Sequence, residues 1–215
     1  MNKKAKQEAL TDIENIGYQM KMVTGLIDRA KQICNETHRA LPERTKEFHS
    51  GTVALACLYI VCEQEMNPRF YDEMCRYKSD VEITPEYLKL IVNELKAQVP
   101  TASVRVRPAA ENFLPRMCGE LALTHKVQAK AAKFLPGLQK QETSADSRML
   151  LAVSIMMATV ETPLESRTPA EVAEVVGVDL IYLSKVYEKL VAQKSKMEKA
   201  KGGNGGDADS KDDAD

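Results

Sequence analysis

The sequence predicts an all-α protein built from two tandem five-helix domains, the second of which ends in a helix-turn-helix. Two uncharged runs, residues 53–62 and 149–158, are apolar on every side, as a helix at the centre of a bundle must be. Both are too short to span a membrane. Each run is followed by an arginine and, four residues later, a glutamate: Arg69 with Glu73, and Arg167 with Glu171. One unit present twice indicates a tandem helical scaffold.

The positions of the individual helices follow from the spacing of apolar residues and from residues that break helices. Apolar residues recur at intervals of three and four, and no segment alternates as a strand would. In the first half we expect helices over residues 6–20, 22–38, 46–65, 70–77 and 85–98. The second half repeats this order over residues 109–121, 124–140, 145–161, 169–176 and 180–198.

Prolines and caps mark the breaks between these helices. A Thr-Pro pair occurs in each half, at Thr84-Pro85 and at Thr168-Pro169. The second pair opens a capping box, with proline in the first helical position and Glu171 in the third.

These helix boundaries divide the chain into four segments. We expect a first repeat at residues 1–99, a linker at 100–108, a second repeat at 109–198 and a disordered acidic tail at 199–215. The tail is rich in Gly, Asn, Asp and Ser, a composition that cannot bury enough apolar surface to fold.

Composition narrows the class of protein. The net charge is −1 over 215 residues, but the second half is mildly basic, which favours an anionic partner there. Five cysteines include no Cys-x-x-Cys pair. Together with the lack of a signal peptide, this favours buried structural thiols in a reducing compartment, and neither a metal nor another cofactor is expected.

The last two helices fit a helix-turn-helix. Ala173 is small, as a close helix crossing requires, and Gly177 lies where the turn needs a positive φ. Val178, Leu183 and Val186 would pack on Val172 and Val176. The exposed face of the second helix would then carry Ile181, Tyr182, Ser184, Lys185, Glu188 and Lys189. Such a pair can lay its second helix in a DNA major groove. A five-helix repeat that ends in two packed helices without touching DNA is equally compatible with the sequence.

A basic stripe precedes this motif. Lys126, Lys130 and Lys133 share one helix face, and Arg105 and Arg107 lie ahead of them in the linker. Phosphate contact is one interpretation. A solvated helix surface is the other, since lysine is ordinarily exposed.

The chain resembles the carboxy-terminal core of the transcription factor IIB family, which is a pair of cyclin folds. In the first half the matching residues are Ala56–Cys62, Gln64, Glu65, Pro68, Arg69 and Glu73. In the second half they are Phe113, Arg116, Cys118, Leu121, Lys126, Val127, Gln128, Ala131, Arg167, Thr168, Glu171, Gly177, Val178, Leu183 and Tyr187. The resemblance covers about residues 10–192.

This resemblance implies a general initiation factor core in the nucleus, acting as a monomer. It would bridge TATA-binding protein and promoter DNA to RNA polymerase II, with no membrane partner. The DNA-binding residues would be Arg105, Arg107, Lys126, Lys130, Lys133, Arg167, Tyr182, Ser184, Lys185 and Lys189. Lys46 and Arg69 would contact the partner protein.

Several positions depart from the family pattern. The amino-terminal zinc ribbon has no counterpart, so the sequence is a fragment or lacks that function. Glu63 stands where the family has a basic residue, and Lys46-Glu47-Phe48 stands where it has Lys-Gly-Arg. Both changes weaken the expectation of DNA contact by the first repeat. Ser184 replaces an arginine that reads bases, so we expect poor sequence reading by the last helix.

The sequence bears on two other classes of function. A cyclin-type regulatory subunit of a protein kinase would share the fold, because fold alone does not fix function. An enzyme is not expected. The three histidines, His38, His49 and His125, lie far apart, and no nucleophile elbow, phosphate loop or zincin spacing occurs.

Overall fold

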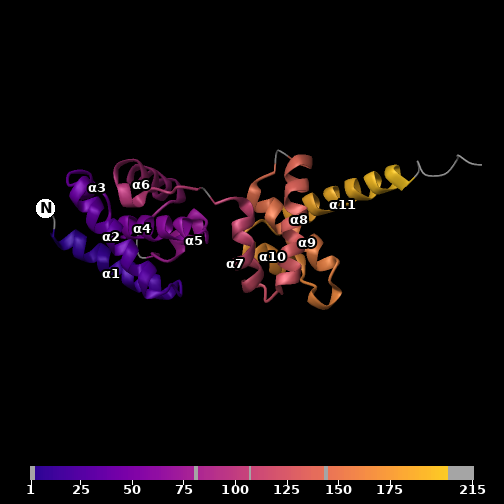
Figure 1. Ribbon diagram of the computed structural model, residues 1–215, viewed down its shortest axis with the longest axis horizontal. Helices are drawn as coiled ribbons and strands as arrows, with labels where there is room; N and C mark the ends of the chain where they lie inside the picture. The colour runs from indigo at the N-terminus through magenta and orange to yellow at the C-terminus, as the bar shows by residue number, and fades with distance from the viewer. Residues whose placement is uncertain (1–2, 80–81, 107, 143–144, 203–215) are drawn as a thin grey trace, which may run out of the picture. The chain divides into compact units, whose positions relative to one another are not determined.

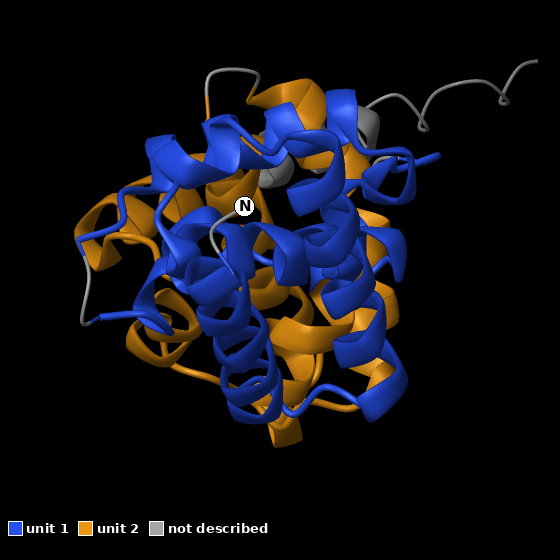
Figure 2. Ribbon diagram, turned by 90° about the vertical axis from the view of Figure 1, so that its left-hand side faces the viewer, with its two compact units in different colours: residues 1–113 blue, residues 114–215 orange. Residues whose placement is uncertain are grey.

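The computed structural model describes residues 3–79, 82–106, 108–142 and 145–202, the last nine of them by their backbone alone. Every regular element within these residues is helical, so the all-α prediction is confirmed. The chain divides into two compact units, residues 1–113 and 114–215 (Figure 2). The division falls after the linker predicted at 100–108, and the domain limits given above stay a prediction.

Unit 1 is built round one buried helix. Its helices are α1 (Lys3–Gln19), α2 (Thr24–Ala40), α3 (Arg44–Glu47), α4 (Ser50–Gln64), α5 (Tyr71–Arg76) and α6 (Pro85–Gln98), followed by the 3-10 turns η1 (Pro100–Ala102) and η2 (Ala110–Phe113). Every residue of α4 from Gly51 to Glu63 is buried. The helices α1, α2 and α6 pack against it (Figure 1).

Unit 2 repeats this plan. It contains α7 (Leu114–Glu120), α8 (His125–Gln141), α9 (Ser147–Val160), the 3-10 turn η3 (Pro163–Glu165), α10 (Pro169–Val176) and α11 (Leu180–Gly202). The buried helix here is α9, whose residues from Met149 to Thr159 are all inside. It is covered by α8, α10 and α11. The prediction that residues 53–62 and 149–158 form the two central helices is therefore confirmed.

The repeat extends to backbone detail. The first helix of each unit ends on a residue in the left-handed region, Lys21 with φ 56° and Ala122 with φ 51°. In each case the next N–H reaches back to the helix, from Met22 to the Gly17 carbonyl at 2.9 Å and from Leu123 to the Cys118 carbonyl at 2.8 Å. The helix that follows has 17 residues in both units. These matching turns support the prediction of a tandem repeat.

One helix starts later than predicted. The expected helix over 46–65 is broken, because Phe48 and His49 are extended, with ψ of 139° and 133°. The Nδ1 atom of His49 accepts a hydrogen bond from the Gly51 N–H at 3.1 Å and so caps α4. Phe48 is buried beneath the Arg44 guanidinium, 5.2 Å from the ring centre. Burial of this ring turns the chain between α3 and α4.

The two Thr-Pro pairs are not equivalent. Thr84 caps α6, the last long helix of unit 1, by accepting from the Tyr87 N–H at 3.2 Å. Thr168 caps α10, which corresponds in position to α5. A Thr-Pro pair therefore marks a favourable helix start in each unit. The two pairs do not occupy equivalent positions, so they are not a sign of the repeat.

Four of the five cysteines are buried and Cys75 is half-buried, all as free thiols. Burial raises the pKa of the Cys118 thiol to about 11, which keeps it protonated and unreactive. At the other end of unit 2, α11 continues to Gly202, past the predicted start of the tail at 199. Residues 203–215 lie outside the described residues.

Candidate nucleic-acid interface

The turn between α10 and α11 is built as the sequence predicts. The Thr168 hydroxyl accepts from the Glu171 N–H at 3.2 Å, and the Glu171 carboxylate accepts from the Thr168 N–H at 2.7 Å, which completes the capping box. At the other end, Gly177 is left-handed, with φ 73°. A Cβ atom at this position would lie 3.0 Å from the Arg148 guanidinium. Glycine therefore meets a backbone requirement, and a larger residue would also press on the end of the Arg148 side chain.

Helix α11 is capped by a residue that the sequence interpretation missed. The Asp179 carboxylate accepts from the Tyr182 N–H at 2.7 Å, as an N-cap side chain does. An aspartate directly before an apolar helical pattern was the available signal. Because a carboxylate already occupies this helix start, the turn is a poor place for a DNA phosphate.

The inward side of α11 is apolar and buried, as predicted. Leu183, Val186 and Leu190 are at most 7% exposed. Val172 and Val176 of α10 are likewise buried. The pair is thus a packed helix-turn-helix unit with one face of α11 left outside.

The outward side of α11 begins with apolar residues. Leu180, Ile181 and Tyr182 are 42%, 66% and 50% exposed. Further along the helix, Lys185 and Glu188 are also exposed and carry opposite charges. Ser184 donates its hydroxyl hydrogen to the Leu180 carbonyl at 3.0 Å. Among the side chains that the structure describes, Leu180–Tyr182 is a run of three consecutive large apolar residues that reach solvent.

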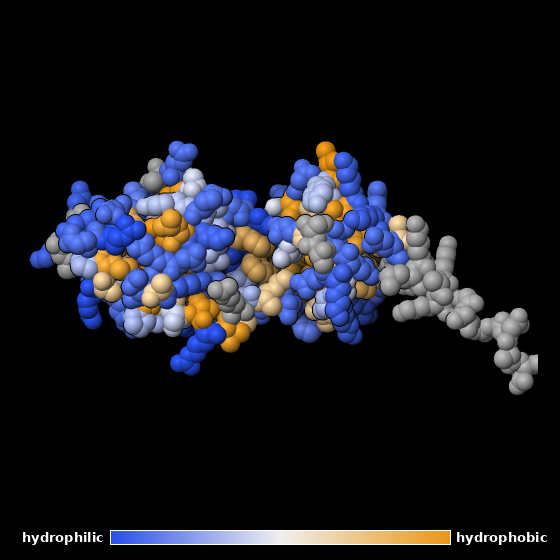
Figure 3. Space-filling model, turned by 90° about the horizontal axis from the view of Figure 1, so that it is seen from above, coloured by the Kyte–Doolittle hydropathy of each residue, from blue (hydrophilic) through white to orange (hydrophobic). Residues whose placement is uncertain are grey.

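The surface elsewhere is mixed. Figure 3 shows hydrophilic residues over most of the face in view, with hydrophobic residues in small, separate areas. Leu164 on η3 is fully exposed, and Val160 at the end of α9 is 64% exposed. Single exposed hydrophobic residues of this kind are ordinary on protein surfaces.

The basic stripe on α8 is not uniform. Lys126 and Lys133 are exposed. Lys130, between them, donates to the Glu161 carbonyl at 2.8 Å and lies 3.6 Å from the Glu161 carboxylate. It thereby ties α8 to the end of α9. The geometry leaves Lys126 and Lys133 as the better phosphate candidates.

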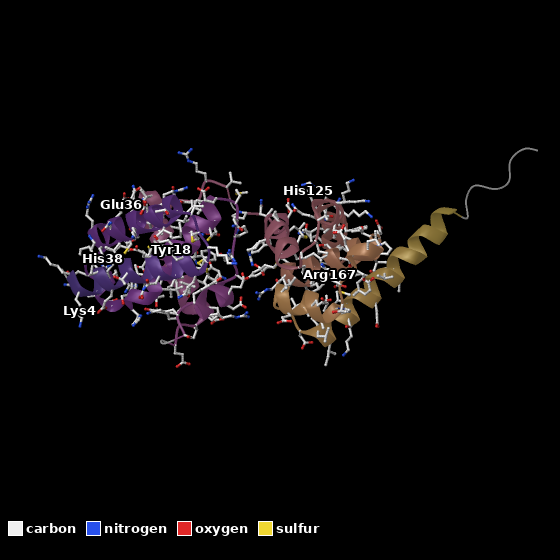
Figure 4. All side chains as sticks on the ribbon, turned by 90° about the horizontal axis from the view of Figure 1, so that it is seen from below. Lys4, Tyr18, Glu36, His38, His125 and Arg167 are labelled. Atoms are coloured by element: carbon white, nitrogen blue, oxygen red, sulfur yellow. The ribbon has the colours of Figure 1, made fainter. Side chains whose placement is uncertain are left out.

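Two other predicted DNA contacts are tied up within unit 2. Lys189 on α11 forms an ion pair with Glu142 at the end of α8. Arg167, labelled in Figure 4, is a residue of the segment between η3 and α10. It donates to the carbonyls of Leu121 at 2.8 Å, Ser166 at 2.8 Å and Ala122 at 3.2 Å. Its guanidinium thus holds the segment ahead of α10 to the end of α7.

A neighbouring carboxylate supports this attachment. Glu165 accepts from the Thr124 N–H at 2.7 Å and from its hydroxyl at 2.8 Å. The backbone hydrogen bond holds the pKa of the Glu165 carboxyl below its ordinary value. Together Glu165 and Arg167 fasten η3 to the turn between α7 and α8. Sequence spacing gives no sign of either contact, because both use backbone groups of a distant segment.

The candidate residues of unit 1 are more scattered. Lys46 pairs with Glu43 at 2.7 Å on an exposed surface. Arg69 is half-buried, and its Nε atom has no hydrogen-bond partner among the described residues. Arg105 is exposed and, with Arg29, lines a hollow of about 600 Å³. Arg107 lies outside the described residues.

Glu63, which departs from the family pattern, lies inside unit 1. It forms an ion pair with Lys96, whose ammonium also lies 5.6 Å from the centre of the Tyr59 ring. The acidic residue at this position is therefore part of the internal packing of unit 1.

Two negative observations concern the described residues. No group of three or more His, Cys, Asp or Glu side chains in that part of the chain is arranged to hold a metal ion. Of the helices described, none combines the length and the apolar character that a membrane crossing needs.

No protein-family model matches the chain. Several curated proteins do, and each is called transcription initiation factor IIB. The one from Xenopus laevis is 25% identical over 187 residues, 86% of this chain and 56% of that protein. The human one is 24% identical over the same shares. The one from Archaeoglobus fulgidus is 31% identical over 148 residues, 65% of this chain and 41% of that protein.

The chain thus spans about half the length of the curated relatives it matches. The similarity extends over both helical units. These relatives are named as initiation factors, which agrees with the prediction that the chain is not an enzyme.

Proposed function

We propose that this chain, a divergent relative of transcription initiation factor IIB, is the helical core of a transcription initiation factor. It joins TATA-binding protein on promoter DNA and links that complex to RNA polymerase II, in the nucleus. The single observation that carries the proposal is similarity to this factor over 86% of the chain. The helix-turn-helix at the end of unit 2 gives the proposed core an element suited to duplex DNA.

DNA contact in this proposal is mainly electrostatic and is made by unit 2. Lys126 and Lys133 on α8 and Lys185 on α11 are exposed and would neutralise phosphates. Lys130, Lys189 and Arg167 were also predicted as DNA contacts. Their intramolecular bonds favour a role in holding the unit together, with DNA contact as a secondary role.

Protein contact is assigned to unit 1. Lys46 and Arg69 were predicted as partner contacts, and Arg69 has a buried Nε atom with no hydrogen-bond partner among the described residues. Overall net charge near zero argues that DNA alone is bound weakly.

The test is a gel shift with promoter DNA, in the presence and absence of TATA-binding protein. We expect a supershifted complex that requires TATA-binding protein. A double variant, Lys126→Glu with Lys133→Glu, should weaken the complex on all promoter sequences alike and make its salt dependence shallower. The matched control reverses two exposed lysines of α1, Lys3→Glu with Lys4→Glu, and should leave both properties unchanged.

Two outcomes would contradict the proposal. Equal shifts with and without TATA-binding protein would remove the bridging role. If the double variant of α8 leaves the affinity and the salt dependence of the complex unchanged, the basic stripe is an ordinary solvated helix surface.

A further inference from the structure

We infer that the acidic segment of this chain, residues 207–215, binds the exposed lysines of α8 and competes there with DNA phosphates. The segment lies outside the described residues, whereas the surface that receives it is described in full. The competition rests on the proposed function, since it assumes that α8 meets DNA. The binding of the segment to α8 does not depend on that function.

Helix α8 is the receiving surface because its charges are all of one sign. Its 17 residues include four lysines and no aspartate or glutamate. Lys126, Lys133 and Lys140 are exposed and follow one another at intervals of seven residues. Seven residues make two helical turns to within about 20°, so these three side chains lie along one side of α8. The result is a line of positive charge on unit 2.

The course of α11 brings the acidic segment within reach of this line. Lys133 and Leu190 line the same hollow of about 180 Å³, so α11 passes beside Lys133. From Leu190 the helix continues to Gly202, which is about 18 Å further at 1.5 Å per residue. An extended chain spans about 3.3–3.6 Å per residue, so residues 207–215 can return about 16–45 Å from Gly202. This range includes Lys133 and the lysines on either side of it.

Charge complementarity identifies the acidic segment as the occupant. It contains five aspartates and a single lysine, Lys211. The sequence between α11 and the segment, at residues 203–206, is Gly-Asn-Gly-Gly, and glycine permits the backbone conformations that a reversal of the chain needs. Each exposed carboxylate–ammonium pair contributes little. A short tether raises the local concentration of the segment to the order of millimolar, so several weak pairs suffice for binding.

Carbodiimide crosslinking of the full chain tests this binding without DNA. The reagent joins a carboxylate to an amine in contact with it, and mass spectrometry identifies the joined peptides. We expect crosslinks from residues 207–215 to Lys126, Lys133 or Lys140 at about 50 mM salt. They should disappear near 1 M salt, where the Debye length is about 3 Å. Lys3 and Lys4, exposed on α1, are the controls and should form no crosslink to the segment.

A chain whose five aspartates in the segment are all changed to asparagine tests the competition. With TATA-binding protein and promoter DNA, this variant should bind about three- to ten-fold more tightly than the unchanged chain at about 50 mM salt. The ratio should fall as the salt rises to about 200 mM, because salt screens exposed pairs. The control combines Asp28→Asn, Glu82→Gln and Glu86→Gln, which remove exposed carboxylates from unit 1 and should leave the affinity unchanged.

The outcomes separate the two proposals. The inference is overturned if no crosslink reaches α8, or if crosslinks are confined to the lysines of residues 194–201, which adjoin the segment in sequence. A gain in affinity by the control equal to that of the asparagine variant would assign the effect to net charge and also overturn it. If a ternary complex forms with equal affinity for the unchanged chain and the asparagine variant, the competition is excluded and the proposed function stands. Failure of both chains to form a ternary complex refutes the proposed function and the competition, while the crosslinks still decide whether the segment binds α8.

Discussion

The two units carry an arginine at the same place and use it differently. Arg69 precedes Phe70, whose N–H donates to Glu73 at 2.7 Å, and Arg167 precedes the Thr168 capping box. The guanidinium of Arg167 donates to three carbonyls, whereas the Nε atom of Arg69 is buried with no hydrogen-bond partner in the described part of the chain. The repeated sequence thus gives the same type of helix start in both units. The contacts of the arginine guanidinium differ, because they depend on the residues that surround it in each unit.

The largest expected effect tests what the units share. Leu58 in α4 and Leu151 in α9 are at most 1% exposed. Replacing either by alanine should lower the free energy of unfolding by about 2–5 kcal/mol, because a cavity is left in a packed core. Denaturant unfolding followed by circular dichroism measures this. Leu90→Ala, at a residue 52% exposed, is the control and should change stability by less than about 0.5 kcal/mol. A loss that small at Leu58 would mean that α4 is not a central helix.

The second prediction tests the difference between the arginines. Arg167→Met removes donors from backbone carbonyls and should destabilise unit 2 by about 1–2 kcal/mol. Arg69→Met removes a donor that lacks a hydrogen-bond partner, so stability should change by less than about 0.5 kcal/mol or rise. Thermal unfolding of the two variants side by side is the measurement. Equal losses of stability in the two variants would show that the two arginines stabilise their units to the same extent.

The third prediction concerns the left-handed turns. Lys21 and Ala122 hold a conformation that glycine adopts without strain, so Lys21→Gly and Ala122→Gly should each stabilise the protein by about 0.5–1 kcal/mol. Gly177 has a positive φ too, and Gly177→Ala should destabilise by about 1 kcal/mol. Urea unfolding resolves changes of this size. Destabilisation by both glycine substitutions would mean that the side chains of Lys21 and Ala122 make contacts worth more than the strain.

The smallest effect is a pH dependence at the start of α10. The Thr168 N–H holds the pKa of the Glu171 carboxyl below its ordinary value. Its contribution to stability is therefore present above the ordinary pKa of about 4.3 and is lost as the pH falls through the lowered one. Glu171→Gln should lose less stability than the wild type on acidification through this range. Glu174→Gln, an exposed glutamate of the same helix, is the control. An identical acid response of wild type and Glu171→Gln would exclude this coupling.

Much of the fold could be predicted from sequence because it depends on local rules. The uncharged runs at 53–62 and 149–158 require burial, and Thr168, Glu171 and Gly177 define helix ends by backbone chemistry. The break at Phe48 could not be predicted from helical spacing, because burial of its ring against unit 1 overrides it. The periodicity of apolar residues describes one helix at a time. It does not show which part of the fold a given side chain will pack against.

The candidate site shows the same limit. Lys126, Lys130 and Lys133 are indistinguishable in sequence, yet Lys130 donates to the end of α9, whereas Lys126 and Lys133 are exposed. Lys189 likewise pairs with a glutamate 47 residues away in the chain. The outward face of α11 was predicted correctly because it is the complement of a periodic apolar face.

The contacts of Arg167 have a consequence for how sequences of this kind diverge. Its partners on the α7 side are the backbone carbonyls of Leu121 and Ala122. Every amino acid supplies such a carbonyl, so side-chain changes at positions 121 and 122 need not break the bond, and this bond constrains the residue type at position 167 alone. Covariation between these positions is therefore not expected, although they are in contact. If distant relatives keep an arginine at position 167, the explanation would be that it attaches one turn of the unit to another. Its presence in those relatives would then not indicate a role in binding DNA.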